Sequence, residues 1–256
     1  MQAQVINQRI RQGFERLLLE CLTSGVQKEL LDQFEVYAGY LLRWRSVAPM
    51  STGEQTSCAL AASYLSAIAV GVMPMDRAAR VRLGQLSKCL GRWGMGSVNT
   101  AAFSATEQEL QQSLTELEAQ GLIAPRASQD ADDSEFGLRV VHMLDVFTAW
   151  SPQPGASPLQ LSDALLALKG LAQQHQDQRI MELAWATANM LDRVIDGTLP
   201  LTEEFKNVVN RAAKLLIIAF VFQVWSAEDE WEYAQTLEDA DLLASGGDVS
   251  SLWRSY

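Results

Sequence analysis

Apolar side chains recur at steps of three and four residues along most of the chain, which is the period of an amphipathic helix. The first such stripe consists of Ile10, Phe14, Leu17, Leu18 and Cys21. Similar patterns cover about 26–47, 53–72 and 76–93. A break rich in glycine and small polar residues follows. Ser104 then stands three residues before Glu107, the spacing of a capping box, and a fifth helical pattern begins there. The first half is therefore predicted to be all-helical.

The second half shows five more segments of helical period, at about 136–150, 157–174, 178–195, 202–225 and 226–246. Their short connections predict an antiparallel helical bundle with an appended acidic helix. Before them, the stretch PRASQDADDSE combines a proline with a succession of polar and acidic residues, which is typical of a linker. The predicted organisation is a helical domain at 1–125, a linker at 126–134, a bundle at 135–248 and a tail at 249–256.

Charge is distributed unevenly between the two halves. Residues 1–125 contain 11 basic and 11 acidic side chains, whereas 126–256 contain 9 and 20, so the net charge of −11 lies entirely in the second half. A surface of that sign repels phosphate backbones and anionic lipid. Nucleic acid and a membrane surface are therefore poor partners for the second half, and we expect no nucleic acid and no membrane insertion.

The cysteines and the apolar runs indicate a cytoplasmic protein. Cys21, Cys58 and Cys89 are odd in number, widely spaced and without a C-x-x-C pair, so we expect reduced thiols. The N-terminus has no apolar signal core. The longest apolar run, 58–75, nearly reaches the length of a membrane span, but its alanines and serines favour a buried helix.

Residues that could perform catalysis are scarce. The two histidines, His142 and His175, are far apart and lack a recognisable partner motif. The sequence contains no dinucleotide, Walker-type or G-x-S-x-G motif. We therefore predict no catalytic, cofactor-binding or metal-binding residue, with His142 at the rim of a core helix and His175 solvated at a helix end.

Two elements at a fixed spacing stand out between residues 165 and 200. The first is Lys169-Gly170. The second consists of Glu182, Leu183, Ala184, Trp185, Asn189, Leu191, Arg193, Val194, Asp196 and Gly197, with no gap. This segment resembles the histidine phosphotransfer domains of CheA-like kinases from type IV pilus chemosensory systems, the ChpA and PilL group, and the FimL-type relatives that lack a kinase. The resemblance extends more weakly from about 134 to 247.

The phosphorylation position departs from the family motif. His-x-x-Lys-Gly becomes Leu166-x-x-Lys169-Gly170, and an isobutyl group has no lone pair with which to attack phosphorus. The family's small residue after Lys-Gly is Leu171, and its glycine at the end of that helix is Gln176. The resemblance therefore implies a pseudo-phosphotransfer bundle in which Trp185 is predicted to be a core residue.

From the resemblance we expect a non-catalytic adaptor in type IV pilus signalling or twitching motility. Its protein-binding residues would be Leu166, Lys169 and Gly170, and its partners would be receiver domains of response regulators or pilus-system proteins. One alternative is an active phosphorelay intermediate that uses His142 or His175.

Residues 1–125 allow two further interpretations. One is a second, more degenerate phosphotransfer-like module. The other is a DNA-binding regulator, because the helix and turn TEQELQQSLTELEAQGLIAP resemble the opening of a winged-helix hairpin. The charges of that helix are all acidic, which is the wrong sign for DNA recognition.

Overall fold

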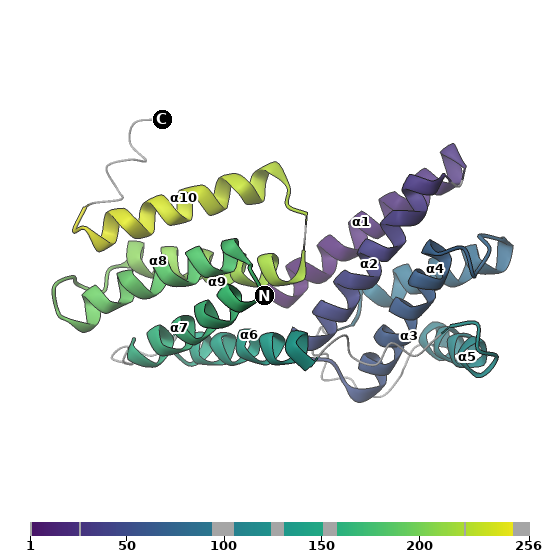
Figure 1. Cartoon of the computed structure of the whole chain (residues 1–256), viewed down its shortest axis with the longest axis horizontal. Coiled ribbons are helices and arrows are strands. Elements are labelled where there is room, and N and C mark those ends of the chain that lie inside the picture. Colours follow the sequence, from purple (N-terminus) through teal and green to yellow (C-terminus); the bar gives the residue numbers. More distant parts are fainter. Residues whose placement is uncertain are drawn as a thin grey trace. The chain divides into compact units, whose positions relative to one another are not determined.

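The structure, a computed structural model, describes residues 2–25, 27–93, 105–123, 131–150, 158–222 and 224–247. Every regular element among these residues is an α-helix, which confirms the predicted all-helical fold class. The chain divides into two compact units, 1–131 and 132–256 (Figure 1). Residues 126–130 of the predicted linker and the whole predicted tail lie outside the described residues. The last predicted linker residues, 131–134, are helical, because the helix that follows begins at Ala131.

The described part of the first unit contains five helices. They are α1 (Gln2–Ser24), α2 (Lys28–Val47), α3 (Thr52–Ala69), α4 (Arg77–Leu90) and α5 (Ala105–Ala119). A capping box begins α3, because Ser51 N donates to the Glu54 carboxylate at 2.7 Å and Glu54 N donates to Ser51 Oγ at 3.3 Å. Asp76 caps α4, because its carboxylate accepts a hydrogen bond from the backbone N–H of Ala79 at 2.8 Å. The capping box predicted at Ser104 lies outside the described residues.

The core of the first unit is built on the paired helices α2 and α3, with α1 and α5 packed against this pair and α4. Trp44 and Tyr64 are among its largest buried side chains. Ser87 Oγ of α4 donates to the Glu15 carboxylate of α1 at 2.8 Å. Asn7 Nδ2, near the start of α1, donates to a carbonyl just beyond the end of α4 at 3.0 Å. Together these bonds fix an antiparallel register of α1 and α4.

The second unit contains five helices in its described part. They are α6 (Ala131–Trp150), α7 (Leu159–Gln174), α8 (Gln178–Ile195), α9 (Glu203–Val221) and α10 (Ala227–Ala244). Helices α7 and α8 form an antiparallel hairpin, and α10 packs on both α8 and α9 (Figure 1). The ring of Phe136 in α6 lies 5.3 Å from that of Phe220 in α9, edge to face. Aromatic packing therefore attaches α6 to the bundle.

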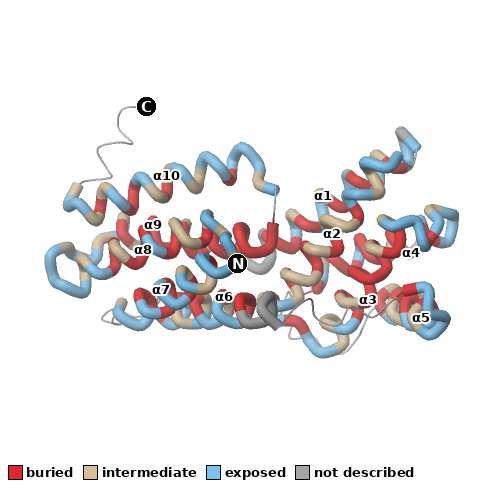
Figure 2. Tube along the Cα trace, in the orientation of Figure 1, coloured by how far each residue is buried: buried red, intermediate tan, exposed pale blue. Residues whose placement is uncertain are grey.

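Helix α9 is the most apolar element of this unit. All residues from 215 to 222 are buried, so its C-terminal half is covered on every side (Figure 2). A helix that is apolar all round belongs in a protein interior. Its polar residues are concentrated in the first half, where Thr202 caps the helix by accepting from Phe205 N at 3.2 Å.

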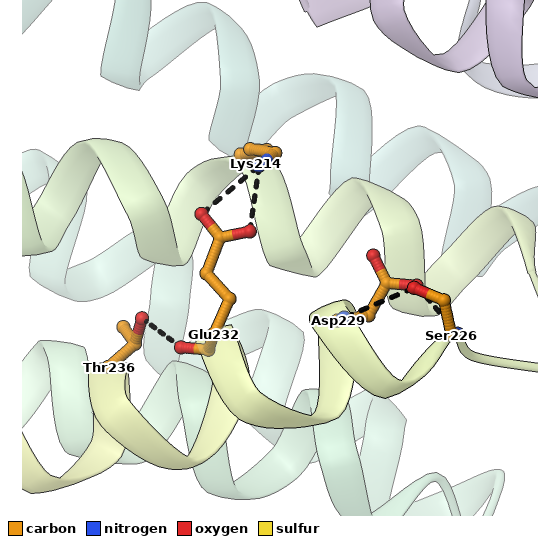
Figure 3. Close-up of polar contacts among 5 residues, drawn as sticks. All are labelled: Lys214, Ser226, Asp229, Glu232 and Thr236. Atoms are coloured by element: carbon orange, nitrogen blue, oxygen red, sulfur yellow. Dashed lines mark hydrogen bonds and ion pairs between the residues drawn. The ribbon is translucent and has the colours of Figure 1, made fainter.

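Several polar contacts attach helix α10 to the bundle. Ser226 and Asp229 form a capping box at its start, with Ser226 N donating to the Asp229 carboxylate at 2.8 Å (Figure 3). One turn later, Lys214 Nζ of α9 contacts both carboxylate oxygens of Glu232, at 2.7 and 3.0 Å. Thr236 is buried, and its hydroxyl donates a hydrogen bond to the backbone carbonyl of Glu232 at 2.6 Å.

Two further ion pairs extend this attachment. Arg211 of α9 pairs with Asp239, whose side chain is completely buried. Arg179 of α8 pairs with Glu230, and its guanidinium lies 4.6 Å from the centroid of the Trp225 ring. A buried carboxylate needs a charged partner, so Arg211 helps to fix the position of α10, whereas the more exposed Arg179–Glu230 pair contributes less.

Within the described ranges, no helix combines the length and the apolar character needed to cross a membrane. Residues 58–68 of the long apolar run form the buried part of α3.

Candidate protein-binding face

The predicted site lies on the α7–α8 hairpin. Ser162 Oγ donates to Asp192 Oδ1 at 2.8 Å across the two helices. Between the two helices, the Asp177 carboxylate caps α8 by accepting a hydrogen bond from the backbone N–H of Ile180 at 3.1 Å. Facing positions of an antiparallel pair have residue numbers with a constant sum. The Ser162–Asp192 bond therefore places Lys169 opposite Trp185.

The turn itself contains an unfavourable backbone conformation. Gln176 has φ 57 and is the one described non-glycine residue with positive φ. Glycine adopts this region without steric cost, whereas other L-residues lose about 1–2 kcal/mol there. The position where the sequence departs from the phosphotransfer motif's glycine is thus one where the backbone favours glycine.

The three residues predicted to bind a partner lie at and just after the middle of α7, with different exposure. Leu166 exposes 42% of its surface, Gly170 is exposed and Lys169 is half-buried. A Cβ added at Gly170 would meet no atom within 4 Å, so packing within the protein does not require a glycine. The predicted phosphorylation position is therefore an apolar side chain directed to solvent.

Trp185 was predicted to belong to the core, and this prediction is wrong. Its side chain is 49% exposed on α8, whereas Met190, five residues later, is completely buried. The Lys169 ammonium lies 5.8 Å from the centroid of the Trp185 ring, within the range of a cation–π contact. Trp185 thus joins Leu166, Lys169 and Gly170 in one surface, which we call the α7–α8 face.

The pattern of α8 contains a signal for this position. Glu182, Asn189 and Asp192 are polar and occur at steps of three and four residues, and Trp185 falls on the same stripe. The core side of α8 is formed by Leu183, Ala184, Thr187, Met190 and Leu191, which are all buried. A tryptophan on the polar stripe of a helix is a better candidate for binding than for the core.

Glu182 is the carboxylate nearest to Trp185 on that stripe, one turn away. It accepts from Tyr233 Oη of α10 at 2.7 Å and from Gln178 Nε2 at 2.6 Å. These hydrogen bonds hold the pKa of Glu182 below its usual range, and the bond from Tyr233 contributes most to this shift. Burial and this bond raise the pKa of Tyr233. Glu182 is therefore engaged with α10.

Neither histidine belongs to the α7–α8 face. His142, which was predicted to lie at the rim of a core helix, is exposed on α6. His175 ends α7 and stacks on Phe136 with ring centroids 4.9 Å apart, so it is packed rather than fully solvated. At 1.5 Å per residue, His175 is about 13 Å along the helix from Leu166.

The cysteines are all buried as free thiols. Cys58 donates to the Leu41 carbonyl at 3.3 Å. Burial raises the pKa of Cys58 and of Cys89 to about 12, so neither forms the thiolate that nucleophilic chemistry needs. In the part of the chain that the structure describes, no three His, Cys, Asp or Glu side chains gather in a group that could hold a metal ion.

The residues behind the winged-helix interpretation are only partly described. Helix α5 contains no basic residue, and on it Glu109 and Glu116 are exposed and Glu118 is half-buried. The segment where a hairpin would follow, 124–130, lies outside the described residues. DNA binding by the first unit stays a prediction without an observation that favours it.

Comparison with known proteins gives no relative for this arrangement. No family model matches the chain, and neither the curated proteins nor the solved structures contain a match. The resemblance to phosphotransfer domains is therefore supported by the sequence motif alone, and the α7–α8 face is defined by its own geometry.

Proposed function

We propose that this chain is a non-enzymatic adaptor that binds a signalling protein through the α7–α8 face. The supporting observation is exposed Trp185, in contact with half-buried Lys169 and beside exposed Leu166. Tryptophan dominates binding energy in many protein interfaces because it buries a large rigid surface. A cation and an aliphatic side chain next to it supply the polar and apolar contacts that surround such a residue.

The motif's resemblance to phosphotransfer domains supports the class of partner. It implies docking of receiver domains, or of other proteins of type IV pilus signalling, on the helix that contains Leu166. Receiver domains have an acidic pocket, and Lys169 is the charged residue of the α7–α8 face. Attraction between opposite charges increases the association rate and fixes the orientation of the partner.

The same face argues against phosphoryl transfer by this chain. The motif's nucleophile is replaced by Leu166, whose side chain has no lone pair. His175 is packed against Phe136, and His142 is on another helix. In the proposed function, the bundle therefore retains a docking surface and has no phosphoryl group to transfer.

A cytoplasmic location is part of the proposal. The three cysteines are free thiols, buried in one unit, and reduced thiols persist in a reducing compartment.

Binding is tested with purified receiver domains of a type IV pilus chemosensory system, titrated into the chain by calorimetry. Lys169→Glu reverses a charge on the face and should weaken binding at least about fivefold, or about 1 kcal/mol. Lys206→Glu makes the same charge change on α9, away from the face, and should leave the affinity unchanged. Equal effects of both variants would contradict a localised docking surface.

Phosphorylation is tested by incubating the chain with an active CheA-type kinase and ATP. The expected result is no incorporated label, whereas a true phosphotransfer domain in the same reaction becomes labelled. Acid-labile phosphate on His142 or His175 would establish the phosphorelay alternative.

A further inference from the structure

Two exposed helix faces, one in each unit, have complementary composition. Helix α10 contains seven acidic residues and no basic one, whereas α4 contains four basic residues and no acidic one. Both helices also expose a large apolar side chain: Trp231 of α10 is 59% exposed and Val81 of α4 is 57% exposed. Each face therefore combines charge of one sign with an apolar centre.

The α10 outer face consists of Glu228, Trp231, Ala234, Glu238 and Asp241, which are all exposed. Their spacings of three and four residues place them on one side of the helix. The opposite side uses its own carboxylates to attach α10 to α8 and α9, as Figure 3 shows for Glu232. Within the described residues, the carboxylates of Glu228, Glu238 and Asp241 have no hydrogen bond or ion pair. They are available to a basic partner.

The α4 basic face consists of Arg77, Arg80, Val81, Gly84 and Lys88. A Cβ added at Gly84 would meet no atom within 4 Å, so this glycine leaves a shallow open position beside exposed Val81. The register set by the Glu15–Ser87 hydrogen bond brings exposed Leu22 of α1 beside Arg80, which widens the apolar part of the face.

We propose that the α10 outer face of one copy binds the α4 basic face of a second copy. In an antiparallel crossing, placing Trp231 over Gly84 brings Ala234 to Val81. The same register brings Glu228 to Lys88 and Glu238 to Arg77.

The spacing of the charges matches this register. Arg77 and Lys88 are 11 residues apart, and Glu228 and Glu238 are 10 apart. These separations correspond to about 16 and 15 Å along a helix. The glycine allows the two backbones to approach at the position of the tryptophan, and the ion pairs at both ends fix the direction. Because the contact uses mainly one helix face of each copy, we expect weak, concentration-dependent association.

The test uses the full chain in sedimentation equilibrium. The wild-type protein should change from the mass of a 28.3 kDa monomer toward higher mass as concentration increases. A double variant of the α4 face, Arg77→Glu with Lys88→Glu, should remain monomeric. A double variant of the α10 face, Glu228→Lys with Glu238→Lys, should also remain monomeric. All four residues are exposed, and a cooperative thermal transition confirms that each variant is folded.

Mixing the two monomeric variants is the discriminating experiment. The mixture pairs an acidic α4 with a basic α10, and a basic α4 with an acidic α10, so association should return. Trp231→Ala should weaken the self-association of the otherwise wild-type chain, whereas Trp185→Ala, which changes another exposed tryptophan, should not. A wild-type chain that stays monomeric throughout, or a mixture that stays monomeric, would overturn the proposal.

Discussion

Replacing Gly170 with alanine should stabilise the second unit. Gly170 lies inside α7 with no positive φ, and an added Cβ meets no atom within 4 Å. Alanine is favoured over glycine inside a helix by about 0.5–1 kcal/mol, because glycine loses more backbone freedom on folding. Since no contact opposes the methyl group, the full propensity difference should appear in the free energy of unfolding.

The matched control is Gly197→Ala, in the same unit. Gly197 follows α8 with φ 69, a conformation that costs alanine about 1–2 kcal/mol. The same chemical change should therefore stabilise the protein at one position and destabilise it at the other. Urea denaturation measures both free energies, and a change of about 1 kcal/mol shifts the melting temperature of a unit of this size by about 3–5 °C.

Destabilisation by Gly170→Ala would refute the reasoning, because it would show that the helix conformation or the space around this glycine is not as described. The variant also separates folding from function. If a partner approaches the α7–α8 face closely at Gly170, the added methyl group should weaken binding while the protein becomes more stable. Opposite signs in the two assays would identify Gly170 as a residue of the binding surface.

Four other substitutions test the hairpin and its neighbours. Gln176→Gly should stabilise the protein by about 0.5–1 kcal/mol in denaturation experiments, because φ 57 favours glycine; a loss of stability would contradict this. Trp185→Ala should cost about 1–2 kcal/mol, since half of the ring is already exposed, whereas Met190→Ala in the core should cost about 2–5 kcal/mol. Tyr233→Phe should raise the pKa of Glu182, measured by NMR, because the hydrogen bond that lowers it is lost. In the wild-type protein, the stabilisation from Glu182 should be present above the ordinary pKa of a glutamate and decrease as pH falls through its lowered pKa. The contribution of Tyr233, whose pKa is raised, should be present below the ordinary pKa of a tyrosine and be lost as pH rises through the raised value.

The helices of the second unit follow closely from the sequence because their ends have local signals. Thr202 and Ser226 cap the two helices predicted to begin there, and the Asp196-Gly197 turn ends α8 with a positive φ at the glycine. Capping and turn chemistry depend on residues only a few positions apart, so a sequence reveals them.

The parts that the sequence did not predict depend on contacts between distant residues. Trp185 was predicted to belong to the core, although its stripe on α8 is polar and the structure exposes it. The side of α10 that faces the bundle is fixed by Arg211 and Lys214, which lie 28 and 18 residues away from their partners. Periodicity alone does not identify such pairs, because α10 has acidic residues on both sides. The predicted binding residues of α7 came from a motif, whereas the position of Trp185 beside them and the α10 outer face required the structure.

The polar attachment of α10 to an apolar neighbour has a consequence for local opening of the fold. Opening α10 breaks ion pairs and hydrogen bonds and exposes few apolar side chains of its own, since Ala240 and Leu243 are its buried apolar residues. It also uncovers the apolar surface of α9, so such an opening should depend both on denaturant, which acts through exposed area, and on salt, which screens the exposed ion pairs. In native-state hydrogen exchange, the amides of α10 should then form a separate group that exchanges earlier than those of α9 and responds to ionic strength.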